Sequence, residues 1–190
     1  MPKIIRRAFK WTLYPVIAVF ALLLYLVGLW ATGNFHEIIP GELYRSAQLS
    51  ESEIHHYTQK YGIRTILNLR GENVGKPWYD EEVAASKANN LTLINYPMLS
   101  RKHLNEKEAA ALIELMRNAP KPILIHCQAG ANRTALASAL YMAGVKHRSE
   151  FISELQLSPI YGHVPLWFSP AYAMDESFES LEPMLGFNGS

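Results

Sequence analysis

The sequence is poor in cysteine, because Cys127 is the only one among its 190 residues. A single thiol excludes an intrachain disulfide and a metal site built from several cysteines. The chain also has little excess charge of either sign, with a formal net charge of +1. Nucleic-acid binding needs a clustered basic face, so we predict no nucleic-acid partner. Any thiol chemistry must use Cys127.

Formal charge is absent from residues 11–36. Residues 11–31 are almost purely apolar and, at a helical rise of ~1.5 Å per residue, reach roughly 30 Å, the thickness of a membrane's hydrocarbon core. The basic residues within 1–10 predict a cytoplasmic N-terminus. We therefore expect a single-pass transmembrane helix in the inner membrane, with the catalytic domain on the extracytoplasmic side. The alternatives are a signal peptide cleaved at the small residues 31–33 and a buried core helix.

Residues 34–190 suit one domain, with a core over about 43–145. Capping boxes at Ser50 and Asn105 predict helices that end at Gly62 and Pro120, and a third helix is expected over 78–89. Apolar runs at 63–69, 91–96 and 122–126 predict buried strands, and 134–143 predicts a tightly packed helix. Less regular segments follow, with possible helices over 149–157 and 174–185. This alternation indicates an α/β fold with a mainly parallel central sheet flanked by helices.

The segment from His126 to Thr134 places the cysteine between an apolar strand and a helix. A loop that enters a helix N-terminus turns backbone N–H groups toward an anion, and the helix dipole lowers the pKa of a nearby thiol. Gly130 allows the tight curvature of the loop. Arg133 offers a planar fork for two phosphate oxygens, and the Thr134 hydroxyl is placed to donate to the departing sulfur.

These residues match the pattern HCxxGxxR(S/T), and the chain resembles the cysteine-dependent protein tyrosine and dual-specificity phosphatases, in particular the small bacterial members, over about 100 residues. The resemblance implies that Cys127 is the nucleophile and that Arg133 binds phosphate. It implies no metal and no organic cofactor. It also implies that backbone amides cradle the anion, at Gln128, Ala129, Gly130, Ala131, Asn132 and Arg133. Arg70, which directly follows a predicted strand, is a further phosphate-binding candidate.

The acidic residue that usually protonates the leaving group in this family has no counterpart in residues 95–105, which contain no Asp or Glu. The candidates elsewhere are Asp80, His103, Glu106 and Asp175. We favour Asp175, because the apolar side chains of 167, 168 and 172 would raise the pKa of a neighbouring carboxyl group.

The sequence therefore predicts a membrane-anchored phosphatase that hydrolyses phosphomonoesters through a phosphocysteine intermediate. The substrate is a phosphorylated protein or a phospholipid or lipid A phosphate. The alternative, favoured by the missing acid, is a catalytically weak phosphate-binding module. A rhodanese-like sulfur carrier is a third possibility, which the Arg133-Thr134 ending of the loop disfavours.

Overall fold

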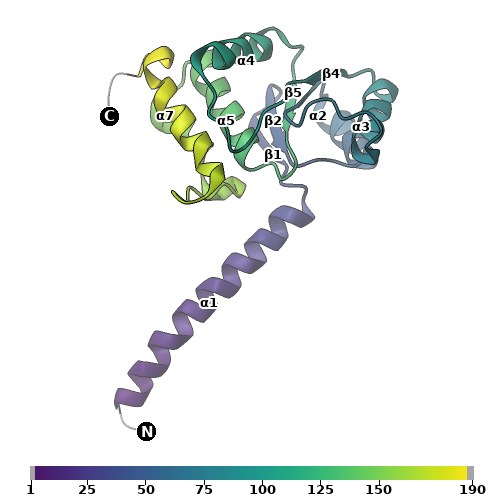
Figure 1. Cartoon of the computed structure of the whole chain (residues 1–190). Helices are drawn as coiled ribbons and strands as arrows, with labels where there is room; N and C mark the ends of the chain where they lie inside the picture. Colours follow the sequence, from purple (N-terminus) through teal and green to yellow (C-terminus); the bar gives the residue numbers. More distant parts are fainter. Residues whose placement is uncertain (1–2, 188–190) are drawn as a thin grey trace.

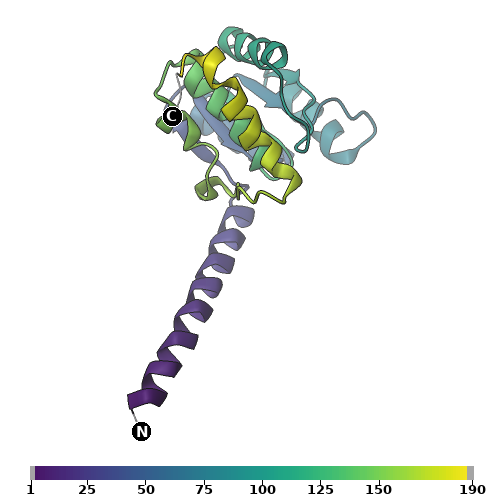
Figure 2. The same cartoon turned by 60° about the vertical axis from the view of Figure 1, so that its left-hand side comes forward.

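The computed structural model describes the backbone of residues 3–187, with the side chains of 3–12, 15, 18 and 170 left undescribed. One long helix, α1, extends away from an α/β domain in both views (Figures 1 and 2). The strands are β1 (His36–Ile39), β2 (Leu43–Ser46), β3 (Thr65–Asn68), β4 (Thr92–Asn95) and β5 (Ile123–His126). The α-helices are α1 (Lys3–Ala31), α2 (Glu51–Tyr61), α3 (Pro77–Ala88), α4 (Glu106–Asn118), α5 (Asn132–Leu140), α6 (Glu150–Glu154) and α7 (Ala173–Leu185).

The strands in this part of the chain form one five-stranded sheet in the order β1-β2-β5-β3-β4. β2, β5, β3 and β4 are parallel, and only β1 at the edge is antiparallel, in a hairpin with β2. The prediction of a mainly parallel α/β sheet is therefore confirmed. In the shared register, Asn68 lies between Asn95 and His126, so the ends of β3, β4 and β5 meet at one edge.

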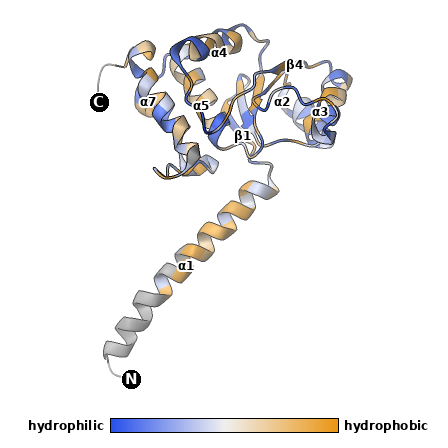
Figure 3. Ribbon diagram, in the orientation of Figure 1, coloured by the Kyte–Doolittle hydropathy of each residue, from blue (hydrophilic) through white to orange (hydrophobic). Residues whose placement is uncertain are grey.

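Apolar residues cover both faces of the sheet, because successive side chains of a strand point to opposite sides. On one face, Ile66 and Leu124 belong to the cluster that packs under α2 and α3. On the other, Leu67 and Ile125 belong to a larger cluster with α4, α5 and α7. Figure 3 shows apolar residues in the strands and along the part of α1 near the domain. Burial on both faces explains why these strands are continuous apolar runs in the sequence.

The helix α1 corrects the membrane prediction. Among the described residues, no helix has both the length and the apolar character needed to cross a membrane. The predicted transmembrane helix over 11–31 and the single-pass inner-membrane location with an extracytoplasmic domain are therefore wrong.

The predicted elements of the domain agree closely with the observed ones. Both capping boxes are present, Ser50 with Glu53 before α2 and Asn105 with Glu108 before α4. Gly62 ends α2 in the left-handed conformation, with φ +65°. The packed helix predicted over 134–143 begins two residues earlier, as α5, and continues as a π-helical turn over Tyr141–Val145. The hairpin strands β1 and β2 are the elements of the sheet that we did not predict.

Candidate active site

The loop formed by residues 127–133 lies where β5 ends and α5 begins, at the same sheet edge as the ends of β3 and β4. Ligands of open α/β sheets bind at this carboxyl edge. Cys127 is buried, with 3% of its surface exposed. The loop therefore places the sulfur at the end of a buried strand and before the N-terminus of a helix, as the sequence predicts.

The peptide carbonyls of Gln128 and Ala129 in this loop point outward to donors from other elements. The backbone N–H of Gln48 donates to the carbonyl oxygen of Gln128 at 3.2 Å. The Nδ2 group of Asn34 donates to the carbonyl oxygen of Ala129 at 3.0 Å and to that of Tyr161 at 3.0 Å. Residues just after α1 and β2 thus hold the loop from outside.

The next two carbonyls face Arg45 on β2. Its Nη2 group donates to the oxygens of Gly130 at 3.1 Å and Ala131 at 3.4 Å, and its Nη1 group donates to Gln156. The guanidinium carbon lies 4.1 Å from the centre of the Tyr161 ring. Burial lowers the pKa of Arg45 to about 10, which leaves it charged at neutral pH. Arg45 therefore presents a buried positive charge to the outer side of the loop.

These four contacts orient the N–H groups of the loop. The peptide unit is planar and trans, so a carbonyl that points outward turns the N–H group of the next residue inward. The inner side of the loop therefore receives successive N–H groups from Ala129, Gly130, Ala131 and Asn132. Such a run of N–H groups at a helix N-terminus favours a bound anion.

Gly130 is fitted to this loop by both conformation and space. Its φ is +67°, and a Cβ atom would lie 2.6 Å from backbone atoms of Ser46 and Ala47. No larger residue fits without displacement of the loop or of the end of β2. The sequence predicts only the curvature, whereas the close approach of β2 comes from the fold.

The two predicted phosphate-binding side chains are those of Arg133, in the loop, and Arg70, just after β3. The Nη1 group of Arg133 donates to the carbonyl oxygens of Leu69 at 3.2 Å and Met98 at 3.3 Å. The guanidinium of Arg70 stacks on Trp78, with its carbon 3.3 Å from the ring centre. Its Nη1 group also donates to Gln48 at 2.9 Å.

The charges of these two arginines lie close enough to influence each other. Burial lowers the pKa of Arg70, and the nearby charge of Arg133 lowers it further, while Glu82 and Cys127 act in the opposite direction. Arg70 therefore lies within electrostatic range of the predicted nucleophile and of the predicted phosphate-binding fork.

Behind the loop, His126 forms a buried pair with Glu82 of α3. Its Nε2 atom lies 2.8 Å from the Oε1 atom of Glu82, which also accepts from Gln48 at 3.0 Å. The Nε2 and Oε1 atoms lie within ion-pair distance, but their geometry is not that of a hydrogen bond. The Oε2 atom of Glu82 has no hydrogen-bond partner among the described residues. The pair fixes the last residue of β5, directly before Cys127.

Asp175 reaches the loop through a histidine. The Nε2 atom of His163 lies 2.9 Å and 3.1 Å from the two carboxylate oxygens of Asp175. Its Nδ1 atom lies 2.8 Å from the Oδ1 atom of Asn132, the first residue of α5. The fold thus connects Asp175 to the loop, although through a contact that the sequence does not reveal.

With this geometry described, comparisons with known proteins can be added. The family model described as "DSP-PTPase phosphatase fused to NAD+ Kinase" matches residues 36–162, more than half of the chain. The chain belongs to this family. It is therefore a phosphatase, a hydrolase of the protein tyrosine and dual-specificity type. The predicted resemblance is confirmed. No curated protein sequence matches the chain.

Solved structures share the fold of this DSP-PTPase domain at low sequence identity. TpbA of P. aeruginosa, in a cysteine-to-serine form in complex with pTyr, superposes with a TM-score of 0.59 and 17% identity, over 83% of this chain and 93% of that one. The core catalytic domain of the PP-IP phosphatase SIW14 from S. cerevisiae, in complex with citrate, gives a TM-score of 0.57 and 18% identity, over 82% and 94%.

The other candidate proton donors of this DSP-PTPase domain lie in ordinary structural positions. Asp80 accepts from the backbone N–H of Gly75, in the turn before α3. Glu106 is the first residue of α4. His103 pairs at 3.3 Å with Glu176, and both side chains are exposed. None of the three contacts residues 127–134 in any interaction that the described residues show.

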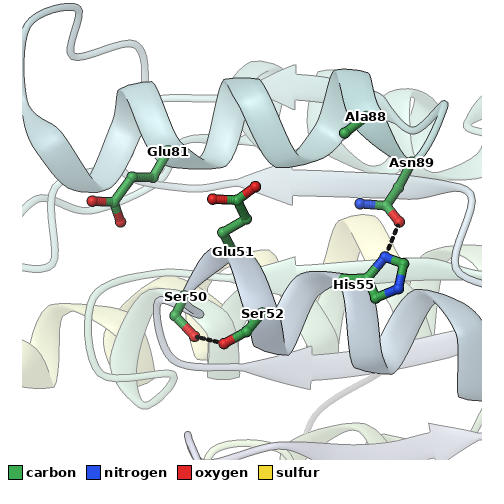
Figure 4. A pocket seen from close by; sticks show the side chains of 7 residues that line it. All are labelled: Ser50, Glu51, Ser52, His55, Glu81, Ala88 and Asn89. Carbon is green, nitrogen blue, oxygen red and sulfur yellow. Dashed lines mark hydrogen bonds between the residues drawn. The ribbon is translucent and has the colours of Figure 1, made fainter.

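A pocket outside the loop lies between α2 and α3 (Figure 4). Its lining includes Glu51, Glu81 and His55, and His55 contacts Asn89. It contains no residue of the loop 127–133. Within residues 3–187, no group of three or more His, Cys, Asp or Glu side chains is placed to hold a metal ion.

Sequence reasoning missed several residues of this site, among them Asn34, Gln48, Glu82 and His163. Each acts on the loop over a long sequence separation, such as the 95 residues between Asn34 and Ala129. No local motif marks them. Glu82 is the one residue of these that the sequence could have indicated, because an acidic side chain within the apolar face of a predicted helix needs a partner.

Proposed function

We propose that this phosphatase hydrolyses phosphomonoesters through a phosphocysteine intermediate. The observation on which this rests is the outward orientation of four successive loop carbonyls, at residues 128–131. It leaves a ring of N–H groups beside the one thiol of the chain. This arrangement stabilises the phosphoryl oxygens throughout the transfer, because donors that are already oriented need no reorganisation.

In the first step, the Sγ atom of Cys127 forms a bond to phosphorus and the bond to the leaving-group oxygen breaks. Arg133 binds two phosphoryl oxygens through its fork. The leaving oxygen takes up a proton. The loop amides and Arg133 hold the phosphoryl group while its bond is exchanged, and Arg70 contacts it from the stack on Trp78.

In the second step, water attacks phosphorus, the bond between phosphorus and sulfur breaks, and phosphate leaves with the Cys127 thiolate restored. Thr134 donates its hydroxyl to the departing sulfur. In support, the Thr134 Oγ1 atom is buried and has no hydrogen-bond partner among the described residues. A hydroxyl without another partner is free to turn toward the sulfur.

The proton donor of the first step stays a prediction at Asp175. The Asp175 side chain is 13% exposed. Both of its carboxylate oxygens contact the Nε2 atom of His163, so the carboxylate is placed as a hydrogen-bond acceptor. A donor role requires that this contact opens when substrate binds.

The substrate of the proposed reaction is a phosphorylated protein or a lipid phosphate. TpbA, which shares the fold, has been seen with pTyr. Apart from Arg133, the loop contributes no cation, so the site is suited to a single phosphoryl group. A panel of phosphotyrosine peptide, phosphatidic acid vesicles and lipid A, measured by phosphate release, ranks these classes.

The mechanism is tested with the full chain and p-nitrophenyl phosphate. The wild type should turn over, while Cys127→Ser should lose activity and still bind inorganic phosphate. Rapid acid quench should trap a phosphoryl group on the peptide that contains Cys127. Turnover by Cys127→Ser at the wild-type rate would exclude the mechanism. Phosphate binding without turnover by the wild type would favour a phosphate-binding module instead.

A further inference from the structure

Three side chains connect the anion-binding loop to the first turn of α7. Asn132 is the residue before Arg133, His163 follows the 3-10 turn Pro159–Tyr161, and Asp175 is the third residue of α7. The contacts are 2.8 Å from Asn132 to His163, and 2.9 Å and 3.1 Å from His163 to Asp175. The helices at the two ends, α5 and α7, pack against each other (Figure 1).

His163 is more deeply buried than either of its partners. Its side chain has no exposed surface, and both ring nitrogens contact an oxygen. Gly162, with φ +78°, turns the chain so that this segment lies against the loop, where a Cβ on Gly162 would be 3.8 Å from that of Ala131. The ring therefore has one orientation, fixed from both sides.

Asn132 is the point at which this contact acts on the site. Its backbone N–H is the last of the inward-pointing groups described above, and the next residue is Arg133. A side-chain contact at this position sets the orientation of the first turn of α5. A misplacement of reacting groups by 1 Å costs on the order of 100-fold in rate.

We propose that His163 and Asp175 are positioning residues, which hold Asn132 so that its N–H group and Arg133 face the bound phosphoryl group. This inference rests on the proposed function of the loop. Asp175 fixes His163 through both carboxylate oxygens, and His163 in turn fixes the Asn132 side chain. Neither residue needs to touch the substrate for this role.

A positioning role and a proton-donor role for Asp175 give different results with different leaving groups. An aryl phosphate such as p-nitrophenyl phosphate needs little protonation of its leaving oxygen, whereas an alkyl phosphate depends on it. Loss of a donor therefore lowers the rate for the alkyl ester alone. Loss of positioning lowers the rate for both esters and weakens the binding of phosphate itself.

The experiment compares full-length wild type with Asp175→Asn, His163→Phe and Asn132→Ala on both esters, and measures the inhibition constant of inorganic phosphate. We expect kcat/KM to fall by about 10- to 100-fold for both esters, with a matching rise in the inhibition constant. Glu179→Gln, one turn further along α7 and exposed, serves as the control and should behave as the wild type.

A double variant, His163→Phe with Asn132→Ala, tests whether the residues act as one unit. It should be no worse than the poorer of the two single variants, since residues that act through each other are not additive. A selective loss of alkyl ester hydrolysis in Asp175→Asn would overturn the proposal in favour of a donor. Full additivity in the double variant, or unchanged kinetics in all three single variants, would also overturn it.

Two controls separate this proposal from folding and from the proposed function. Urea midpoints identify a variant that fails to fold. If His163→Phe fails to fold, Asn132→Ala, at a partly exposed position, supplies the test instead. Phosphate binding is also measured by calorimetry in the Cys127→Ser background. There, His163→Phe or Asn132→Ala should weaken phosphate binding even if the proposed covalent mechanism is wrong, and unchanged binding contradicts the positioning role.

Discussion

Replacement of Gly130 by alanine is the perturbation whose cost follows most directly from the structure. The new Cβ would lie 2.6 Å from backbone atoms of Ser46 and Ala47, about 1 Å closer than a comfortable carbon contact. A left-handed φ costs an L-residue about 1–2 kcal/mol, and overpacking adds about 1–3 kcal/mol. We expect Gly130→Ala to lower the free energy of unfolding by about 2–5 kcal/mol.

The matched control for this prediction is Gly41→Ala. Gly41 has a φ of +70°, close to the +67° of Gly130, but a Cβ there meets no atom within 4 Å. It should therefore show only the conformational cost of about 1–2 kcal/mol. The difference between the two variants isolates the steric contribution of the close approach between the loop and β2.

Urea unfolding and the hydrolysis of p-nitrophenyl phosphate are the two assays. Because the clash displaces the loop or the end of β2 by about 1 Å, kcat/KM should fall by roughly 100-fold in Gly130→Ala and stay near the wild-type value in Gly41→Ala. Equal losses of stability in the two variants, or full activity in Gly130→Ala, would refute the reasoning.

Three further predictions concern charged side chains of the domain. Arg45→Met should lower kcat/KM at least about tenfold because two loop carbonyls lose their donor, and phosphate inhibition constants should rise in parallel; unchanged constants contradict this. Arg70→Ala should raise KM more than it lowers kcat if Arg70 contacts the phosphoryl group, and Trp78→Leu should cause a smaller change of the same kind, both read from steady-state kinetics. Burial raises the pKa of Glu42, but hydrogen bonds from Tyr141 and Lys146 outweigh it and lower the pKa overall. The stability from Glu42 is thus present above its unfolded pKa of about 4.3 and lost as the pH falls through the lower folded value; urea midpoints of Glu42→Gln should be below wild type at pH 7 and converge with it in acid.

Much of the fold could be predicted because local interactions determine it. A capping box is complete within four residues, so Ser50 and Asn105 mark the starts of α2 and α4 without knowledge of the rest. The strands β3 and β5 are recognisable because both of their faces are buried and their sequences are apolar runs. The hairpin strands β1 and β2 were missed because His36–Ile39 and Leu43–Ser46 are short and form no long apolar run.

The candidate site was predictable only along its own segment. The motif from His126 to Thr134 identifies the proposed nucleophile, the proposed phosphate-binding arginine and the tight glycine. The residues that orient the loop lie far away in sequence, such as Arg45, whose contact with Gly130 spans 85 residues. The Asp175 prediction selected a residue that does lie near the site, but the sequence did not reveal His163 between it and the loop.

The proposed chemistry of this protein rests on a single cysteine and an arginine in a loop between a strand and a helix, and these are consecutive residues that the sequence alone determines. Which way each loop carbonyl points, and hence whether the loop can hold an anion, was decided by the tertiary structure. The physical reason is that each peptide plane is turned by a donor from outside the loop. Asn34, Arg45 and Gln48 reach it only once the sheet has brought β2 beside β5.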